Sequence, residues 1–433
     1  MASTYLSRTL GTATNRKKFT ISLWFKKASN SGHQYFLGTG VDGNNNDAFS
    51  IHSTIQSLKI GGYESGTTYE LKTNASLRDN SAWYNAVVSF DSTQSTNTNR
   101  LKMYINGEQV TSFATAVYPS LNYEPLINKN TAHNIGAAYN ASGFFDGSMA
   151  MVQFVDGQAY DATYFGSTDS TTGIWTPQAS STISSYGTNG FKLKMDTATP
   201  GADTSGNTNT FTVGGGTPTL TQGSPSNNWC TMNPIVYSGT SGQPVFSNGN
   251  TTVGTTTSGW KPAFGSIGVT SGKWYFETKV VGYNHCVVGI ANETGTYNTV
   301  TSGFPPSQPY SYGIVCYDLG QKETNNSRTA YGVSANITDG QIIGTAIDLD
   351  NNKLYWSVNG VFKNSGDPTS GSTGTGSAFS LQAGETYFPM VVGNTGGGSN
   401  PAGGNLNFGE GFFGTTAAGI NADDNGQGLF AYD

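Results

Sequence analysis

The sequence contains few charged residues. Asp, Glu, Lys and Arg together make up 11% of the 433 residues, against roughly 25% in a typical globular protein. The 21 Lys and Arg residues are scattered, and the formal net charge is −6. We interpret two short basic clusters, Arg16-Lys17-Lys18 and Lys26-Lys27, as solvated strand ends. Because nucleic-acid binding requires a broad basic face, we expect no nucleic-acid partner.

Cysteine and long apolar segments are also scarce. The cysteines, Cys230, Cys286 and Cys316, are widely spaced and odd in number, so they predict neither a disulfide framework nor a metal site. We expect them to be small buried apolar groups, which fits synthesis in a reducing cytoplasm. No apolar run reaches membrane-spanning length, and residues 1–18 lack the apolar core of a signal peptide. We therefore expect no membrane partner and no secretory route.

Glycine, aromatic residues and small polar residues are abundant instead. The chain has 58 glycines, and 12% of its residues are aromatic. This composition disfavours helices and favours strands and turns. Disordered chains have few aromatics and high charge, so we expect a folded protein, and its length is sufficient for two or three domains. A polar surface with little charge suits extracellular or virion proteins, in which many copies pack side by side.

Two segments far apart in the sequence show the same alternation followed by the same turn. In the second half, Leu354, Trp356 and Val358 share one face of a predicted strand, and Asn359-Gly360 follows. Asn-Gly is a strong hairpin signal, since both residues tolerate the positive φ of a type I′ turn. In the first half, residues 101–107 repeat the pattern and end in Asn106-Gly107. The two copies predict two β-sandwich domains with the same hairpin.

The first predicted sandwich resembles a known family. Short strands separated by turn signals are typical of a sandwich. The segments that carry the resemblance are Phe19 to Lys26, Trp83 to Val88, Asn106-Gly107, Asn134-Ile135-Gly136, and Phe145-Asp146-Gly147 leading into Val152. They resemble the laminin-G/concanavalin-A-like jelly roll, to which we assign residues 1–178. Residues 179–228 follow as a Gly/Ser/Thr-rich bridge and linker, in which Gly190 to Val213 either closes the first sandwich or bridges it to the next.

A second set of segments, beyond Trp229, resembles the SPRY fold, which is another β-sandwich. In chain order it consists of Gly272 to Glu277, Val288-Gly289-Ile290, Tyr312-Gly313, Asp339-Gly340, Ile347 to Asp350, Leu354 to Gly360, Tyr387-Phe388-Pro389 and Asn407-Phe408-Gly409. We assign residues 229–413 to this sandwich and residues 414–433 to a C-terminal extension. The predicted fold is therefore all-β, with two jelly-roll-like sandwiches in tandem and a bridge between them.

The tandem of these two domains resembles virion proteins of tailed bacteriophages. The resemblance implies a structural and adhesion protein of a phage particle, in a fibre or as capsid decoration. It implies a homo-oligomer that contacts other virion proteins and binds host-surface polysaccharide. The expected location is the virion surface, after synthesis in the host cytoplasm. Residues 421–430 are similar to that family's C-terminal extension, which usually runs on further.

Calcium is the one cofactor that the first resemblance suggests. Concanavalin-A-like folds often bind calcium through Asp and Asn residues in loops, so Asp42, Asp47 and Asp146 are candidate ligands. Asp42, Asn44 and Asn46 match the first three ligand positions of a calcium loop, but the sixth and twelfth positions do not match. Plain Asx-rich turns, with no cofactor, are the alternative.

Aromatic residues on loops are candidates for glycan contacts, because flat rings beside amides suit sugars. The candidates are Tyr139, Phe144, Tyr310 and Tyr312. Packing in the core or in an interface is the alternative for each of them. Resemblance to a lectin fold does not by itself confer lectin activity.

We predict that the chain is not an enzyme. Glucanases need two carboxylates facing one sugar bond, and no Glu-x-Asp-x-x-Glu pattern occurs. No Gly-x-Ser-x-Gly motif occurs either, and the four histidines lack the spacing of a triad or a metal site. Two alternatives remain: a capsule or polysaccharide depolymerase, and a cellular SPRY-type protein-interaction module.

Overall fold

The computed structural model describes residues 3–178, 182–196, 198–236, 242–294, 309–395 and 402–432, and nearly all of its regular structure is β. The predicted all-β class is therefore confirmed. The chain divides into two units, Met1–Leu220 with Ser224–Asn228, and Thr221–Gly223 with Trp229–Asp433. In the described part of the chain, no helix combines the length and the apolar character needed to cross a membrane.

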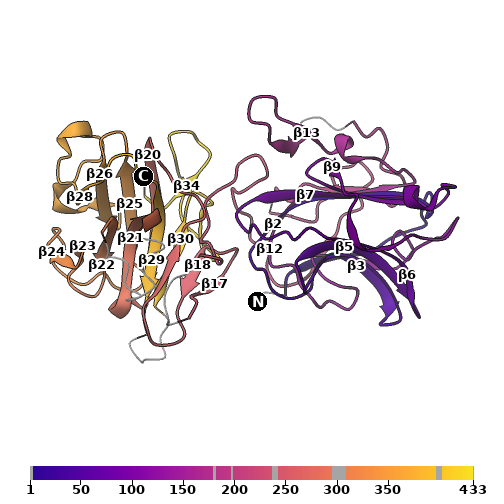
Figure 1. Cartoon of the computed structure of the whole chain (residues 1–433), viewed down its shortest axis with the longest axis horizontal. Helices are drawn as coiled ribbons and strands as arrows, with labels where there is room; N and C mark the ends of the chain where they lie inside the picture. Colours follow the sequence, from indigo (N-terminus) through magenta and orange to yellow (C-terminus); the bar gives the residue numbers. More distant parts are fainter. Residues whose placement is uncertain are drawn as a thin grey trace. The chain divides into compact units, whose positions relative to one another are not determined.

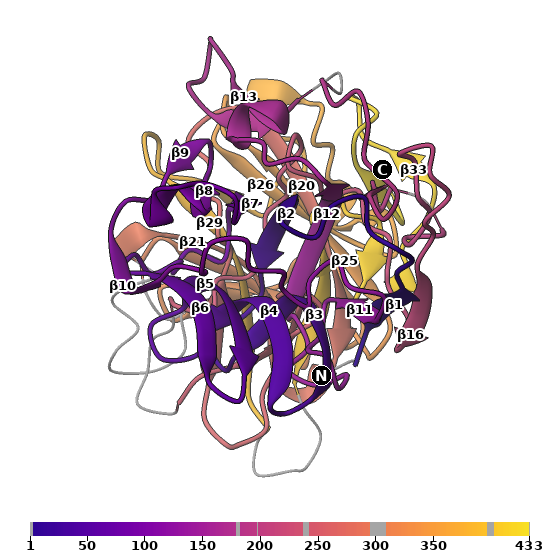
Figure 2. The same cartoon turned by 90° about the vertical axis from the view of Figure 1, so that its right-hand side faces the viewer.

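The first unit consists of two large antiparallel sheets and one small hairpin (Figure 1). In sheet order, the eight-stranded sheet contains β10 (Phe113–Val117), β6 (Thr67–Thr73), β5 (Ser57–Glu64), β4 (Asn45–His52), β3 (Gln34–Asp42), β11 (Ala132–Ile135), β1 (Tyr5–Thr9) and β16 (Thr212–Gly215). The six-stranded sheet contains β15 (Phe191–Leu193), β12 (Gly147–Asp156), β2 (Lys18–Lys27), β7 (Trp83–Asp91), β8 (Leu101–Ile105) and β9 (Glu108–Gln109). The hairpin pairs β13 (Gly166–Thr168) with β14 (Trp175–Pro177). Figure 2 shows β6, β4, β3, β11 and β1 in this order across the larger sheet, with β5 between β6 and β4.

The core of the first unit lies between its two large sheets. Phe19, Ile21, Leu23 and Phe25 of β2 all belong to it, as the alternation predicts. Trp24 faces the other way and is also buried, at 2% exposure. On the same outer face as Trp24, Val87 and Tyr104 pack with Ala162, Phe165 and Tyr186 in a second apolar cluster. Apolar side chains are therefore buried on both faces of this sheet.

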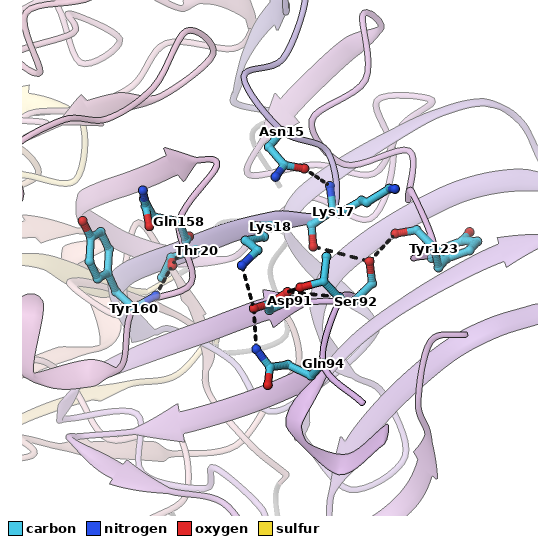
Figure 3. Close-up of polar contacts among 11 residues, drawn as sticks. Asn15, Lys17, Lys18, Thr20, Asp91, Ser92, Gln94, Tyr123, Gln158 and Tyr160 are labelled. Carbon is cyan, nitrogen blue, oxygen red and sulfur yellow. Dashed lines mark hydrogen bonds and ion pairs between the residues drawn. The ribbon is translucent and has the colours of Figure 1, made fainter. Parts of the chain in front are cut away.

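Polar side chains fix the ends of these strands (Figure 3). Asp91, at the end of β7, accepts a hydrogen bond from Gln94 Nε2 at 2.7 Å and pairs with Lys18 Nζ at 3.2 Å. Thr20 in β2 donates to Gln158 O at 2.9 Å and accepts from Tyr160 N at 2.8 Å. The Thr20 hydroxyl therefore holds the start of the segment that covers the outer face of the sheet.

The expected bridge contributes strands to the first unit. Within it, β15 pairs with β12 of the six-stranded sheet, and β16 pairs with β1 of the eight-stranded sheet. The first sandwich therefore extends beyond residue 178, and Phe191, Leu193 and Phe211 are part of its core.

The second unit is also built on two large antiparallel sheets around one core. The larger sheet contains β17 (Val245–Ser247), β18 (Thr252–Gly254), β30 (Gly403–Asn407), β20 (Lys273–Val281), β25 (Ile342–Asp348), β26 (Lys353–Val358) and β27 (Val361–Phe362), with β28 (Phe379–Ser380) pairing β26. The smaller contains β19 (Lys261–Phe264), β29 (Tyr387–Gly393), β21 (Cys286–Asn292), β22 (Ser311–Val315), β23 (Gln321–Thr324) and β24 (Ser327–Thr329). Two hairpins follow, β31 (Phe412–Phe413) with β32 (Thr416–Ala417), and β33 (Asn421–Ala422) with β34 (Leu429–Phe430).

All three cysteines lie in the second unit, and none of them forms a disulfide. Cys286 and Cys316 are completely buried in its core, as expected for small apolar groups. Cys230 is partly buried and packs against the edge of that core.

The C-terminal residues pack on the second unit as part of it, although the sequence analysis set them apart as an extension. The buried carboxylate of Glu277 in β20 accepts hydrogen bonds from Ala431 N at 2.9 Å and Tyr432 N at 2.7 Å. The Phe430 ring lies edge-on to Tyr275, at 5.2 Å between centroids. These contacts cover the outer face of β20.

Both Asn-Gly hairpins have the conformation that the sequence predicts. The φ angles are 48° and 86° at Asn106 and Gly107, and 49° and 77° at Asn359 and Gly360. Each Asn side chain also accepts a hydrogen bond from a neighbouring strand: Asn106 Oδ1 from Asn85 N at 2.8 Å, and Asn359 Oδ1 from Ile342 N at 2.9 Å. The same turn and the same hydrogen bond therefore recur in both sandwiches.

We predict that Asn359→Ala destabilises the second unit by about 2–3 kcal/mol, because alanine is strained at positive φ and cannot accept from Ile342 N. Asn359→Gly keeps the conformation and loses only the hydrogen bond, so it should cost about 1 kcal/mol. Urea unfolding of the full chain gives the two values, and hydrogen exchange of residues 342–362 assigns the transition to the second unit. Equal costs for the two variants would contradict a role for the backbone conformation.

Candidate functional site

A groove of about 130 Å³ crosses the outer face of β3, β4, β5 and β6 in the first unit. The pleat of β4 creates it, because Phe49 and Ile51 point into the core while Ala48 and Ser50 point outward. Gly61 in β5 adds no side chain to this outer face. The residues that line the groove are His33, Tyr35, Asn46, Ala48, Ser50, Lys59, Gly61, Gly62, Tyr63, Thr67 and Glu70.

Aromatic rings contribute to the groove from β3 and β5. The His33 and Tyr35 rings stack at 4.6 Å between centroids, with 5° between their planes. His33 Nε2 shares a hydrogen bond with Ser50 Oγ at 3.0 Å, which fixes the imidazole over β4. Tyr63 is 40% exposed. The groove therefore offers a rigid stacked pair of rings and one accessible phenol ring.

Gly143 makes room for the Tyr35 ring. A Cβ at residue 143 would lie 2.6 Å from the Tyr35 ring, and the φ of +57° is itself unfavourable for other residues. The backbone of Phe144, the next residue, forms a β-bridge with Tyr35. A glycine is therefore required beside the groove for the ring to take this position.

An ion pair joins β5 and β6 within the groove. Lys59 Nζ lies 2.8 Å from Glu70 Oε2, and the two side chains are 25% and 16% exposed. Pairs of this kind contribute little to stability. Their position among the lining residues instead supplies a hydrogen-bond donor and an acceptor to anything that enters the groove.

Two histidines beside this pair have lowered pKa values. Burial, followed by smaller effects of His52 and Lys59, lowers the pKa of His33 from 6.5 to about 4, against an opposing effect of Glu70. Burial, Lys72 and Lys59 lower the pKa of His52 in the same way. The His33 and His52 rings are 5.3 Å apart. His33 is therefore neutral at pH 7.

Two of the four predicted glycan contacts lie near the groove. Tyr139 is close enough to Tyr35 to raise the pKa of its hydroxyl, after the larger effect of burial. The ring of Phe144 packs against Tyr5, with the centroids 6.0 Å apart. Both side chains are half-buried, and neither belongs to the residues that line the groove.

The other two predicted contacts are in the second unit and differ in exposure. Tyr312 is 7% exposed and packs in the core, with its ring 5.1 Å from Phe379 and 6.1 Å from Tyr387. The suggestion that Tyr312 presents its ring to a sugar is therefore wrong, because β22 turns this residue inward. Tyr310 is 39% exposed.

The structure does not bring the three predicted calcium ligands together. Asp42 Oδ1 accepts from Asn44 N at 2.7 Å and from Asn45 Nδ2 at 3.0 Å, so it closes the turn between β3 and β4. The backbone N of Asp146 donates a hydrogen bond to Gln34 Oε1 at 3.0 Å, and its backbone O accepts one from Ala28 N at 2.9 Å. Among the residues that the structure describes, no three or more His, Cys, Asp or Glu side chains are grouped to hold a metal ion.

Asp47 is buried on the core side of β4, at 1% exposure. Its Oδ2 accepts from Ile127 N at 2.9 Å. Its Oδ1 and the Tyr69 hydroxyl are also buried, and within the described part of the chain neither makes a hydrogen bond of good geometry. Burial raises the pKa of Asp47 from 3.8 to about 6, although the Ile127 and Leu126 N–H groups and the Tyr69 hydroxyl lower it.

We predict that Asp47 makes the first unit less stable as pH rises from 4 to above 6. In this range the folded state holds a proton that the unfolded state has released, so the slope of stability against pH is negative. Asp47→Asn should remove this dependence and raise stability at pH 7.5 by about 1–3 kcal/mol, with little change at pH 4. Urea unfolding at the two pH values measures the difference.

Asp42→Asn, at the exposed end of the same hairpin, is the control for the loss of one negative charge. A pH profile of Asp47→Asn that parallels the profile of the unaltered protein would contradict the burial of an ionisable carboxyl at this position.

The groove residues were not predicted from the sequence. Tyr35, Lys59 and Glu70 lie on β3, β5 and β6, and His33 directly precedes β3, so only the register of β3 to β6 brings them together. The signal in the sequence was the alternation of each strand. The residues that face away from the core, such as Tyr35, Tyr63 and Lys59, are aromatic or polar here.

The first unit is a β-sandwich of two packed antiparallel sheets, with a polar and aromatic groove on one outer face. Residues 2–162 match the model of a protein family described as the concanavalin A-like lectin/glucanases superfamily. The match ends before residues 191–215, which complete the two sheets.

Three different proteins are among the solved structures that are similar to this chain. The SPRY domain of human HERC1 has 18% identity and a TM-score of 0.30, covering 40% of this chain and 94% of that domain. A heptameric SAP-like pentraxin from Limulus polyphemus has 14% identity and a TM-score of 0.27, covering 37% and 72%. Domain 4 of AbnA, a GH43 extracellular arabinanase from Geobacillus stearothermophilus solved with arabinotriose, has 16% identity and a TM-score of 0.26. This match covers 33% of the present chain and 63% of that chain, which is less than two thirds of its length.

Proposed function

We propose that the protein binds carbohydrate and that the groove on β3 to β6 of the first unit holds the glycan. The observation that carries this proposal is the groove itself, an aromatic and polar hollow within the residues that match a lectin family. Host-surface polysaccharide is the proposed ligand.

The groove has the chemistry that a pyranose ring requires. The accessible Tyr63 ring and the His33–Tyr35 stack can contact the apolar C–H face of a sugar. Lys59, Glu70, Ser50 and Thr67 can exchange hydrogen bonds with its hydroxyl groups. Most sugar ligands need both kinds of contact, because each ring has one apolar face and a polar rim.

We propose that binding occurs without cleavage. Hydrolysis of a glycosidic bond needs two carboxyl groups about 5–10 Å apart on either side of the bond. The residues that line the groove include one carboxylate, Glu70, which is paired with Lys59. This favours a binding protein over a depolymerase.

We also propose that the chain is a structural and adhesion protein of a phage particle, as fibre or capsid decoration on the virion surface. The support is the resemblance of the tandem to such proteins and a surface with few charges, which allows copies to pack closely. In this proposal the chain is a homo-oligomer that contacts other virion proteins. Electron microscopy of particles labelled with an antibody against the chain tests the location, and labelling absent from particles would contradict it.

We predict that Tyr63→Ala weakens glycan binding by roughly three- to tenfold, because the sugar loses its aromatic contact. The measurement is binding of the full chain to an array of capsular and lipopolysaccharide oligosaccharides, followed by calorimetry with the glycan that binds. Tyr63 is on the surface, so the variant should keep the melting temperature of the unaltered protein within a few degrees.

The matched control is Tyr310→Ala in the second unit, since Tyr310 and Tyr63 are 39% and 40% exposed. Binding lost in the Tyr310 variant and kept in the Tyr63 variant would move the glycan site to the second unit. An array on which no glycan binds would contradict carbohydrate binding altogether.

A further inference from the structure

The groove carries both charges of an ion pair but little net charge. Lys59 Nζ and Glu70 Oε2 are 2.8 Å apart, and both side chains are at least three-quarters buried. They are the only Lys, Arg, Asp or Glu residues among the described residues that line the groove. A ligand therefore meets a closed pair, in which neither charge lacks a counter-charge.

The histidines keep this balance at neutral pH. Burial and the charge of Lys59 lower the pKa of His33 to about 4, and burial with Lys72 and Lys59 lowers the pKa of His52. Glu70 opposes both effects and is too weak to reverse them. Neutral imidazoles give the groove no additional positive charge with which to bind an acidic sugar.

The neighbouring polar groups are fixed and uncharged. Asn46 Nδ2 donates to the backbone oxygens of Asp42 at 3.3 Å and Gly43 at 3.1 Å, so its amide is held in place. Ser50 Oγ is held by His33 Nε2 at 3.0 Å. Hydroxyl groups of a neutral sugar can bond to such dipoles without removing a charge from water. A carboxylate would lose hydration here, and the lysine that lines the groove, Lys59, already pairs with Glu70.

We propose that the groove selects electrically neutral glycans over acidic ones, and that the Lys59–Glu70 pair determines this selectivity. The inference rests on the proposed carbohydrate binding and adds the class of ligand to it. Glu70 acts by neutralising Lys59 and by repelling a second carboxylate. Removing the Glu70 charge alone should therefore convert Lys59 into a site for acidic sugars.

The test uses the full chain and a matched pair of probes. Each uncharged array glycan that binds is compared with the same glycan after oxidation of its primary hydroxyl groups to carboxylates. We expect the unaltered protein to bind the oxidised form at least about fivefold more weakly. Glu70→Gln should reverse this preference, and its gain for the oxidised form should diminish at high salt, because it depends on an exposed charge.

Two further variants separate this effect from a general change in charge. Lys59→Gln leaves Glu70 without its partner and should weaken binding of the oxidised glycan further. Glu124→Gln removes a carboxylate that pairs with Arg16 at 3.1 Å in a separate hollow, and it should leave the preference unchanged. Melting temperatures of all three variants verify that they are folded.

The outcomes distinguish the two proposals. Tightest binding to acidic glycans by the unaltered protein, or an unchanged preference in Glu70→Gln, overturns the selectivity and leaves carbohydrate binding in place. Absence of binding to every glycan, neutral or acidic, overturns carbohydrate binding and the selectivity together. Reversal in Glu70→Gln with no effect of Glu124→Gln supports both.

Discussion

In each sandwich, one buried carboxylate holds together segments that are distant in the sequence. Asp156, at the end of β12, accepts from Thr14 N at 2.6 Å, Asn189 N at 3.1 Å and Asn128 Nδ2 at 2.7 Å. Glu277 in β20 accepts from two backbone N–H groups of the C-terminal segment and from Asn407 Nδ2 at 3.2 Å. A carboxylate is among the few side chains that can satisfy several donors at once, and leaving these donors unpaired inside the protein would cost about 1–3 kcal/mol each. Each carboxylate therefore ties loop or terminal segments to a strand of its own sandwich.

Other acidic residues close turns, which explains why few of them are available for a site. In the segments Asp79-Asn80-Ser81, Asp91-Ser92-Thr93, Asp161-Ala162-Thr163 and Asp367-Pro368-Thr369, the carboxylate accepts from the backbone N–H and the hydroxyl of the third residue. Asp42 acts similarly through Asn44 N. These Asx turns join residues that are two apart in the sequence, so forming them costs little conformational entropy. A chain with 27 acidic residues thus uses several of them as turn residues, and the low charge content leaves a surface in which one ion pair within a groove can dominate recognition.

The sequence predicted the parts of the fold that depend on neighbouring residues. The alternation within Phe19 to Phe25 and within Leu354 to Val358 predicted which side chains face the core. The Asn-Gly pairs identified both hairpins. Both predictions succeeded because the pleat of a strand and the conformation of a turn are local properties. Burial that depends on distant segments was not predictable. Tyr355 alternates with Leu354 and Trp356 and so faces away from their core, yet it is completely buried, since the loop that contains Gly366 and Ser370 contacts it. The site residues could not be predicted from the sequence for the same reason, because their positions depend on distant segments. The pleat turns Asp47 inward, and the diagonal contact between Lys59 and Glu70 follows from a register, Gly61 opposite Glu70, that no single strand encodes.

The position of the groove follows from which sheet faces the chain leaves uncovered. Ala162, Phe165 and Tyr186 pack on the outer face of the six-stranded sheet of the first unit. In the second unit, the C-terminal segment covers β20, and Val236, Trp260 and Tyr317 pack on the outer side of the smaller sheet. In the described part of the first unit, β3 to β6 keep an outer face built from small and polar residues around Tyr35 and Tyr63. A covering segment needs a large apolar surface on which to pack, and Ala48, Gly61 and the Lys59–Glu70 pair provide little of it. The same residues that keep this face open are the ones suited to an uncharged, hydroxyl-rich ligand, so the absence of a cover and the proposed specificity have one cause.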